Sequence, residues 1–592
     1  MPQKKKIQRR LVSDSALLSG LPEFLNRIYS ARGVRSLSDL DLSLNQLQHS
    51  EKIKGIELAV ELLIETLNKK KKILIVGDFD CDGATSTALA MLVLKQLGAD
   101  CQFLVPNRFE FGYGLTPEIV ELAYTEKPYL IVTVDNGISS IEGVKRAKQL
   151  GIKVLITDHH LPGNMLPEAD SIVNPNQPGC EFLSKNAAGV GVIFYVMSAL
   201  RARLRELNWF QMSGLPEINM ASYLDLLALG TVADLVPLDL NNRILVEQGL
   251  RRIRAGRCRP GIKALLTLAG KNLEHTHASD MGFIVGPRLN AAGRLDDMSL
   301  GINCLLTDSD SEADLLARKL DQLNQERKDI EQEMRLDAEA QLSVYFDRFD
   351  QQGLSSFDDK TDWGLCLYQP HWHQGVIGIL ASRIKEKLNR PVIVFAPASD
   401  DPLEKDMVLK GSARSIPGFH MRDALDLLAK RHPSLLAKFG GHAMAAGMSI
   451  ELNNFDAFSN AFNTIVKETL SESDLEAILF TDGELVEEER TLENIELLLQ
   501  AGPWGQAFPE PSFDGVFNVL QQRVLKERHL KLVLSDQLGN QFVDAIQFNS
   551  EWCQENLPNK IRVVYRPNIN EYRGKKSVQF FIDYIEPFSE IN

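Results

Sequence analysis

The chain reads Ile73-Leu74-Ile75-Val76-Gly77-Asp78-Phe79-Asp80-Cys81-Asp82-Gly83 at the point that decides its fold. The apolar half of this stretch is typical of a strand buried in a parallel sheet. The second half places three carboxylates within five positions, where their charges repel one another unless a cation lies among them. Because open α/β sheets bind ligands at the carboxyl ends of their strands, we expect a metal site at this edge.

Two other structures share this acid-rich pattern. A calcium loop of the helix-loop-helix type also begins Asp-x-Asp-x-Asp-Gly, but it requires a Glu six residues after the Gly, and that position is Leu89 here. It also requires an entering helix, whereas an apolar, β-rich run precedes these acids. A solvated turn stays open on this motif alone, and only the rest of the chain argues against it.

Three further apolar runs end in acidic side chains: 130–134 before Asp135-Asn136-Gly137, 154–157 before Asp158-His159-His160, and 226–233 before Asp234. We interpret each run as a candidate strand, and helical segments lie between them. This pattern predicts an α/β domain with a parallel sheet over roughly residues 72–240. Acids at the ends of several strands of one sheet would lie close together.

Length and composition indicate a globular protein of several domains. At 592 residues, with 44% hydrophobic and 24% charged residues, the chain is large enough for several ordinary cores. The net charge of −14 argues against a protein that coats nucleic acid non-specifically, although it allows a local basic groove. The N-terminus lacks the apolar core of a signal peptide, no apolar run is long enough for a membrane helix, and the cysteines form no C-x-x-C pair. We therefore expect a cytoplasmic protein with no membrane contact, disulfide or zinc site.

The remaining sequence predicts three further parts. Residues 308–352 contain neither Gly nor Pro, and their leucines recur at helical spacing, which predicts one long connecting helix, with a coiled-coil helix as the alternative. Residues 364–448 indicate a second α/β unit with strands at 365–368 and 392–395. Short β-rich runs follow at 530–534, 542–548, 561–565 and 578–582. These runs predict a small β-barrel such as an OB-fold, or alternatively a β-sandwich. We place the domains at 1–307, 308–352 (the helix), 353–468 and 469–592.

The ligand types indicate the metal and the reaction. Carboxylates with only one or two imidazoles favour hard divalent ions, so we expect Mn²⁺ or Mg²⁺ rather than zinc. The predicted ligands, enough for two ions, are Asp80, Asp82, Asp135, His159 and Asp234. Two ions about 3.5 to 4 Å apart can activate a water and stabilise the leaving oxygen of a phosphoester. Hydrolysis of a phosphoester or phosphoanhydride is therefore the predicted reaction, with a single structural ion as the alternative.

Two segments in the second half carry groups suited to phosphate. Gly411-Ser412-Ala413-Arg414-Ser415 is predicted to place hydroxyls and a guanidinium within one turn. The stretch 439–447 combines a glycine pair, His442 and the small residues of a helix start, whose N–H groups could hold an anion. A tightly packed glycine turn explains either segment equally well. Gly189 and Gly191 lack the third glycine of a nucleotide fingerprint, so we interpret them as helix-packing positions.

Taken together, these motifs resemble those of the DHH phosphoesterase superfamily. The resemblance rests on Asp78-Phe79-Asp80-Cys81-Asp82-Gly83, Val134-Asp135-Asn136-Gly137, Asp158-His159-His160 and Ala233-Asp234, and then on Ser412-Ala413-Arg414-Ser415 and Gly440-Gly441-His442-Ala443 of the DHH-associated domain. Further matches at 106–108, 112–114, 286–294 and 373–378 narrow it to bacterial exonucleases specific for single-stranded DNA, and 509–511 and 570–574 are similar to their OB-fold.

The resemblance implies hydrolysis of single-stranded DNA from a 5′ end to mononucleotides, in DNA repair and recombination. It implies Mn²⁺ or Mg²⁺ between two α/β domains, with an OB-fold at the mouth of a channel too narrow for a duplex. Carried over residue by residue, it assigns the metal to Asp80, Asp82, Asp135, His159 and Asp234, adds His160 beside them as a catalytic group, and assigns phosphate and DNA contacts to Arg108, Arg288, Ser412, Arg414 and His442. The sequence departs from the family at Val76, where many members have a His, which predicts that one ion site has fewer ligands.

The resemblance also implies partners, and two rival functions stay open. Single-stranded DNA is the expected substrate, a helicase and a single-strand-binding protein are expected associates, and we expect a monomer. A phosphohydrolase of pyrophosphate or short oligonucleotides would share the acids but have less use for the barrel. A non-catalytic replication protein would share the fold but would have lost ligands, and none of the acidic motifs is broken here.

Overall fold

The computed structural model describes residues 5–12, 18, 20–106, 114–352, 363–398, 407–436, 438–539 and 541–588; Arg108 of the predicted site lies outside them. The chain forms two compact units. The first unit consists of Val12–Gln325 and Leu497–Glu510, and the second of Met1–Leu11, Glu326–Glu496 and Pro511–Asn592. Each unit therefore includes a short segment that is remote in sequence from the rest of that unit.

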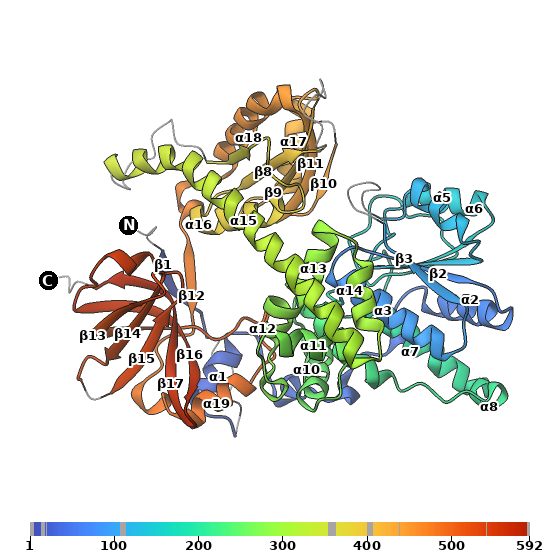
Figure 1. The fold of residues 1–592 in the computed structure, drawn as a ribbon, viewed down its shortest axis with the longest axis horizontal. Coiled ribbons are helices and arrows are strands. Elements are labelled where there is room, and N and C mark those ends of the chain that lie inside the picture. The colour runs from blue at the N-terminus through green and yellow to red at the C-terminus, as the bar shows by residue number, and fades with distance from the viewer. Residues whose placement is uncertain are drawn as a thin grey trace. The chain divides into compact units, whose positions relative to one another are not determined.

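A five-stranded parallel sheet forms the core of the α/β part of the first unit (Figure 1). Its strands, in spatial order, are β3 (Cys101–Leu104), β2 (Ile73–Gly77), β4 (Leu130–Val134), β5 (Lys153–Thr157) and β6 (Ser171–Val173). The predicted strands 73–77, 130–134 and 154–157 are confirmed, and β3 and β6 add two strands that the apolar runs do not reveal. Gly77, Val134 and Thr157 lie side by side in the register. The acidic motif after each of these strands therefore starts at the same carboxyl edge.

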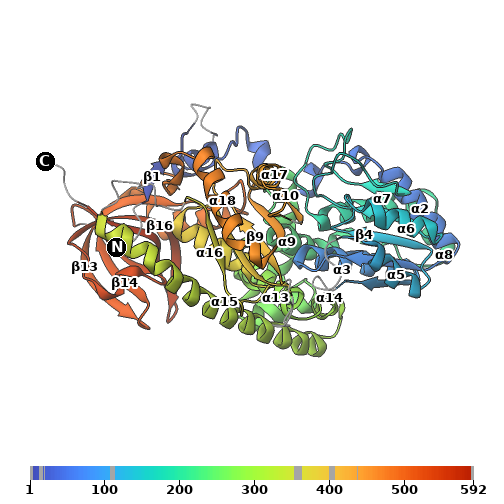
Figure 2. The same ribbon diagram turned by 90° about the horizontal axis from the view of Figure 1, so that it is seen from above.

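Helices cover both faces of this sheet (Figures 1 and 2). The alternate residues Leu74, Val76, Ile131, Val154 and Ile156 pack in one core cluster with α5 (Pro117–Thr125) and α6 (Ile141–Gln149). Figure 1 shows α3 (Cys81–Gln96) and α7 (Gly189–Glu206) on the other face. A sheet buried on both faces explains the continuous apolar runs of its strands.

Further described helices of the first unit include α1 (Glu23–Ser30), α2 (Ile56–Asn68), α8 (Trp209–Ser213), α9 (Leu224–Ala233), α10 (Leu240–Arg254), α11 (Pro260–Leu268), α12 (Ala278–Asp280), a π-helix (Met281–Val285), α13 (Gly286–Leu295) and α14 (Ser299–Leu306). The prediction of a strand at 226–233 is wrong, because this run lies in α9. Residues 224–231 of α9 are all buried, so no amphipathic period marks the helix, while its leucines and alanines favour helix.

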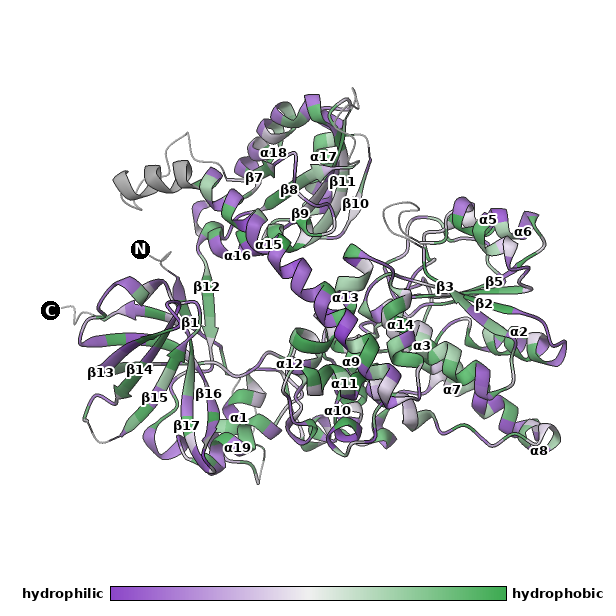
Figure 3. Cartoon of the chain, in the orientation of Figure 1, coloured by the Kyte–Doolittle hydropathy of each residue, from purple (hydrophilic) through white to green (hydrophobic). Residues whose placement is uncertain are grey.

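The long helix predicted over 308–352 is confirmed as α15 (Asp310–Gln352). Its residues belong to both units. Figure 3 shows mostly hydrophilic residues along its coloured length, as expected for a helix with many charges. Among the described residues, no helix combines the length and apolar composition that a membrane crossing requires.

A mixed five-stranded sheet confirms the second α/β unit. In spatial order its strands are β10 (Lys438–Gly441), β11 (Ala445–Glu451), β9 (Val408–Arg414), β8 (Val392–Pro397) and β7 (Leu365–Tyr368), with helices α16 (Ile377–Leu388), α17 (Met421–Arg431) and α18 (Phe455–Thr469). Two local predictions are wrong. Ser412 and Arg414 are not in a turn, because they lie on β9, which pairs with strands on both sides. The segment after Gly441 starts no helix, because β10 and β11 pair there as an antiparallel hairpin.

The C-terminal strands close into the predicted barrel. Its strands, in spatial order, are β13 (Phe513–Leu525), β14 (His529–Ser535), β15 (Phe542–Gln547), β17 (Lys575–Pro587) and β16 (Lys560–Tyr572). Closure around one core excludes the β-sandwich. The rings of Tyr565 and Phe580 stack within this core, 3.9 Å apart and with no exposed surface. The four predicted runs correspond to β14–β17, and β13 is the strand that the sequence does not reveal.

The N-terminus is part of the second unit. β1 (Lys6–Arg9) pairs in parallel with β12 (Ile478–Thr481), which precedes α19 (Leu492–Gln500). Both nitrogens Nε and Nη2 of Arg9 lie 3.1 Å from carboxylate oxygens of the buried Asp514 at the start of the barrel. Arg562 Nη2 and Thr481 Oγ1 donate to the same carboxylate at 2.8 and 2.7 Å. These hydrogen bonds attach the N-terminal strand to the barrel.

Candidate metal centre

Acidic and imidazole side chains converge at the carboxyl edge of the parallel sheet. Three overlapping groups each place one ligand atom per residue within 4.8 Å of the others: Asp78, Asp80 and Asp135; Asp82, His159 and Asp234; and Asp135, His159 and His160. All five predicted metal ligands, together with His160, are thus brought together in the first unit. The side chains come from β2–α3, β4, β5 and the end of α9.

The N-termini of two helices hold the first pair of acids. Asp80 caps α3, where its Oδ1 accepts a hydrogen bond from the Gly83 N–H at 2.9 Å. Asp82 lies in the first turn and is 1% exposed. It accepts hydrogen bonds from the N–H groups of Gly189 at 2.6 Å and Val190 at 3.0 Å, which begin α7. Backbone donors and helix dipoles therefore fix the position of this carboxylate.

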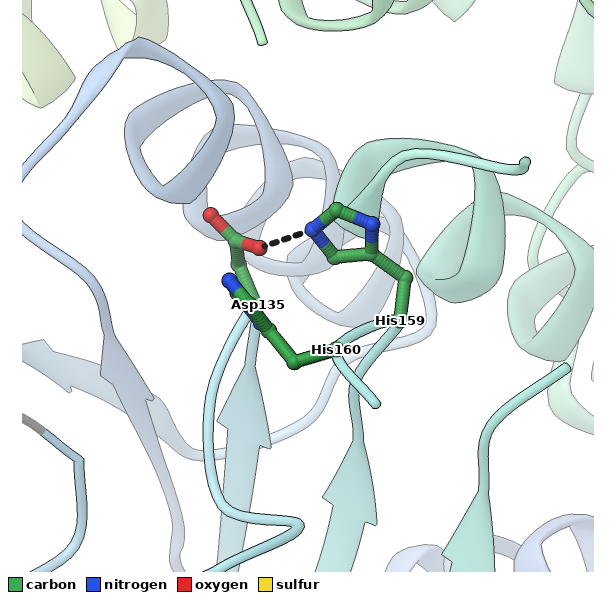
Figure 4. A group of neighbouring side chains, drawn as sticks. All are labelled: Asp135, His159 and His160. Carbon is green, nitrogen blue, oxygen red and sulfur yellow. Dashed lines mark ion pairs between the residues drawn. The ribbon is translucent and has the colours of Figure 1, made fainter. Parts of the chain in front are cut away.

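Asp135 follows β4 directly and has a left-handed backbone with φ of 63°. Its N–H donates to Thr157 O at 3.0 Å, which keeps the turn level with β5. Its Oδ1 lies 3.1 Å from His159 Nε2, and the dashed line in Figure 4 marks this pair. A Cβ atom on Gly189 would lie 2.7 Å from both Cβ and Oδ1 of Asp135. Only glycine at this position lets α7 approach so closely.

Asp158, which the sequence motif includes but to which no role is assigned, organises the histidine pair. This buried carboxylate accepts hydrogen bonds from the N–H groups of Ile138, His159 and His160 at 2.8, 2.7 and 3.1 Å. It also lies 2.8 Å from His160 Nδ1. Burial opposes the charge of His160, but the hydrogen bond to Asp158 raises the pKa of His160 to about 9. Asp158 is thus a supporting carboxylate that orients His159 and His160.

Asp234 completes the group as the residue after α9, and its Oδ2 lies 3.5 Å from His159 Nε2. This oxygen is buried and has no hydrogen-bond partner among the described residues. Burial, followed by the charges of neighbouring carboxylates, raises the pKa of Asp82 to about 7 and raises those of Asp135 and Asp234 well above their ordinary value. Carboxylates that destabilise one another in this way are stabilised by a cation, so the oxygen-rich set fits divalent Mn²⁺ or Mg²⁺.

Asn290 supports the site, whereas Val76 belongs to the core of the sheet. The side chain of Asn290, on α13, accepts a hydrogen bond from the Cys81 N–H at 2.7 Å and so fixes the turn that carries Asp80 and Asp82. Val76 is 1% exposed and packs in the apolar cluster of the sheet. Asn290 lies in the segment 286–294 that matches the family, so the sequence could have marked it as a candidate. Its hydrogen bond to the Cys81 N–H cannot be predicted from sequence spacing.

The predicted phosphate-binding residues fall into both units. Arg288 lies in the first unit and is already engaged: Nε and Nη2 lie 2.8 Å from Asp321 Oδ1, and Nη1 donates to Ile284 O at 2.8 Å. His442, Ser412 and Arg414 lie in the second unit. His442 is exposed, and its N–H donates to Ala445 O at 2.8 Å within the β10–β11 hairpin.

Arg414 is mostly buried and has an unusual set of neighbours for a guanidinium. Its Nε donates to Ser382 Oγ at 3.1 Å, and its Nη1 donates to Ser412 Oγ at 3.1 Å and to Ala413 O at 2.8 Å. Burial lowers the pKa of Arg414, and no carboxylate of the described residues forms an ion pair with it. A Cβ on Gly378 would lie 3.0 Å from both Arg414 Nη2 and Ser412 Oγ. A buried cation beside two hydroxyls and a close glycine is suited to a phosphate oxygen.

Three family models match the chain: the DHH family, N-terminal domain, at residues 72–231, the DHHA1 domain at residues 364–468, and the RecJ OB domain at residues 481–584. The single-stranded-DNA-specific exonuclease RecJ of Dickeya dadantii (strain 3937) is 51% identical over 98% of this chain and 99% of its own length. Two crystal structures of RecJ from Thermus thermophilus are also similar. The complex with Mn²⁺ covers 99% of this chain and 80% of that one (TM-score 0.76, 28% identity), and the complex with Mg²⁺ covers 99% and 78% (TM-score 0.72, 27% identity).

Proposed function

Because the chain belongs to the RecJ family of single-stranded-DNA-specific exonucleases, we propose that it hydrolyses single-stranded DNA from the 5′ end and releases 5′-mononucleotides. The observation that carries this proposal is the convergence of Asp80, Asp82, Asp135, His159 and Asp234 at one sheet edge. The cofactor is Mn²⁺ or Mg²⁺, since oxygen-rich donors with one imidazole suit these ions and both occur in similar structures.

The residues of the chain have distinct tasks in this reaction. Two divalent ions held by these residues would supply an activated water and stabilise the leaving oxygen. Asp82 and Asp135 are held by backbone N–H groups and a tight turn, so they present oxygens in fixed positions. Asp158 holds the backbone of His159 and the ring of His160. Such supporting contacts keep ligands oriented, which is what an ordered site requires.

Recognition of a phosphate by the second unit is proposed for Arg414 with Ser412. The guanidinium already donates to two hydroxyls, and a phosphate oxygen would supply the negative charge that its surroundings lack. Arg288 is a weaker candidate on geometry, because Asp321 already pairs with it. We assign the preference for a 5′ end to this recognition of a terminal phosphate.

The barrel is proposed to hold the strand through exposed aromatic rings. Phe542 and Phe548 are 64% and 53% exposed, whereas Tyr565 and Phe580 are buried. The Phe548 ring also contacts Phe581, with centroids 5.7 Å apart, which positions it on the barrel surface. Bases stack on such rings with little sequence preference, which suits an enzyme that digests any strand.

The cellular context follows from the substrate. Single strands arise when a duplex is opened, so we propose a helicase and a single-strand-binding protein as associates in DNA repair and recombination. We further propose that the enzyme acts as a monomer in the cytoplasm. None of these features determines the chemistry of the site.

Digestion of single strands labelled at either end tests the proposal. With Mn²⁺, the 5′ label should be released first, as a mononucleotide, and a 5′ phosphate should accelerate release in wild type but not in Arg414→Ala. Release of the 3′ label first would overturn the polarity. A higher kcat/KM on a dinucleotide than on a long strand would instead favour a phosphohydrolase of short oligonucleotides.

A further inference from the structure

Residues Leu497–Glu510 precede the barrel in sequence but belong to the compact unit that carries the metal centre. They are bonded to α1 and to the turn after it: Tyr29 Oη donates to Ala501 O at 2.8 Å, and Arg32 Nε donates to Pro509 O at 2.8 Å. Between these points the rings of Trp504 and Phe508 stack, with centroids 5.2 Å apart. The segment is therefore an ordered part of the first unit.

This segment contacts the loop that follows Asp234. The Leu238 N–H donates to Gln506 O at 2.8 Å. A Cβ on Gly505 would lie 2.7 Å from Leu238 Cδ1 and 3.2 Å from its Cγ, and Leu238 is only 4% exposed. The Arg243 guanidinium, on the helix after this loop, lies 4.1 Å from the Phe508 ring centroid. Backbone, side chain and ring contacts thus converge on residues 235–243.

The same loop is connected on its other side to the helix that holds Asp82. Asp239 Oδ2 accepts hydrogen bonds from Ser184 Oγ at 2.7 Å and Asn186 Nδ2 at 3.2 Å. Asn242 Nδ2 donates to Asn186 O at 2.7 Å and to Pro237 O at 2.9 Å. Residues 184–186 lead directly into α7, whose first N–H groups hold Asp82. The loop therefore links the surroundings of two metal ligands.

The backbone of the loop is strained where it leaves Asp234. Leu235 has φ of 57° and is 68% exposed, although a leucine gains nothing from a left-handed conformation. Strained residues of this kind persist only where surrounding contacts over-determine them. The Leu235 N–H donates to Val232 O of α9 at 3.3 Å, and Gly505 and Gln506 hold the loop three residues later, at Leu238.

We propose that residues Trp504–Phe508 are a positioning element of the metal centre, which holds loop 235–239 and thereby sets the position of the Asp234 carboxylate. The inference rests on the proposed metal-dependent function. Groups that bond directly to a metal ligand typically change metal affinity by about 10- to 100-fold when altered, and because this segment acts through the loop, we expect an effect near the lower end of that range.

Binding of Mn²⁺ alone to the full chain tests this proposal, measured by the loss of the free-ion electron paramagnetic resonance signal without DNA. Gly505→Val adds a side chain where Leu238 already packs, and Trp504→Ala removes the ring that stacks on Phe508. Each variant should weaken Mn²⁺ binding about tenfold or more. The control is Gly163→Val, an exposed position in the same unit, where an added Cβ meets nothing closer than Met165 O at 3.9 Å.

Asp234→Asn defines the loss expected when the ligand itself is altered. Gly505→Ala, which adds one methyl group, replaces Gly505→Val if the larger variant is insoluble. Affinities within twofold of wild type in both the Gly505 and the Trp504 variant would overturn the positioning role. So would a lower melting temperature at unchanged affinity. If wild type itself binds no Mn²⁺, the proposed function fails instead, so the two failures are distinguishable.

Discussion

Gly189→Ala should slow cleavage about 100-fold while leaving the fold and DNA binding of the enzyme intact. The added Cβ would lie 2.7 Å from both Cβ and Oδ1 of Asp135. Carbon atoms in contact are ordinarily about 3.5–4.0 Å apart, so the Asp135 side chain or the start of α7 must move by roughly 1 Å. The Gly189 N–H, which holds Asp82, would move with it. One methyl group therefore displaces two predicted metal ligands.

A displacement of about 1 Å in a catalytic site costs roughly 100-fold in rate, which corresponds to about 2.7 kcal/mol of transition-state stabilisation. The overpacking itself should cost about 1–3 kcal/mol of stability. We therefore expect kcat on a 5′-labelled strand to fall about 100-fold. The dissociation constant for single-stranded DNA, measured by fluorescence anisotropy in EDTA, should stay near that of wild type.

Gly191→Ala is the matched control, because it adds the same methyl group to the same helix. There the added Cβ would meet Ala187 Cβ at 3.6 Å, an ordinary contact. Alanine also favours helix over glycine, so this variant should be at least as stable as wild type. The reasoning would be refuted if kcat of Gly189→Ala stayed within threefold of kcat of Gly191→Ala.

Three other outcomes are expected. Asp135→Asn should abolish cleavage and largely keep single-strand binding, and nuclease activity in this variant would exclude the metal mechanism. Phe548→Ala should weaken strand binding by about 1 kcal/mol or more, as loss of one stacked base predicts, whereas Leu538→Ala, also exposed but not aromatic, should bind like wild type. Burial opposes ionisation of Asp514, but hydrogen bonds from Arg9 and its neighbours lower the pKa of Asp514 in the folded protein. The ionised carboxylate therefore stabilises the fold above its unfolded pKa of about 3.9. This stabilisation is lost as the pH falls through the lower pKa of the folded protein. Asp514→Asn should therefore be less stable than wild type near neutral pH and should lose less stability in acid. If the free energies of unfolding in urea of wild type and Asp514→Asn changed in parallel with pH, this prediction would be contradicted.

The parallel sheet was predictable because its physical signal is local. Runs such as 73–77 and 130–134 are apolar on both faces, and the acids after them mark the strand ends. The predicted metal ligands follow from the same signal, since strands that end level bring Asp80, Asp135 and His159 together. The run before Asp234 has the same composition, but there the element is a helix, and periodicity cannot distinguish a fully buried helix from a buried strand.

Features that depend on tertiary contacts were not predictable. The glycine pair beside His442 resembles a helix start, but strand pairing decides its structure. The sequence predicts only a packing role for Gly189, yet its N–H bonds to Asp82 and its missing Cβ leaves room for Asp135. Such roles depend on residues more than 50 positions away in sequence, and no local propensity encodes them. The same holds for Asn290 and its hydrogen bond to Cys81.

The exchange of short segments between the two units changes how the rival functions are separated. Deleting the chain beyond about Leu470 would distinguish a phosphohydrolase of small substrates from a single-strand exonuclease only if the deletion removed the barrel and left the rest of the protein unchanged. Such a deletion would also remove β12, which pairs with β1, and residues Trp504–Phe508, which contact the loop after Asp234. Loss of activity would then follow for a small substrate as well as for a long strand. Phe548→Ala alters only the barrel surface, so its effect on long strands and its lack of effect on dinucleotides are the discriminating measurements.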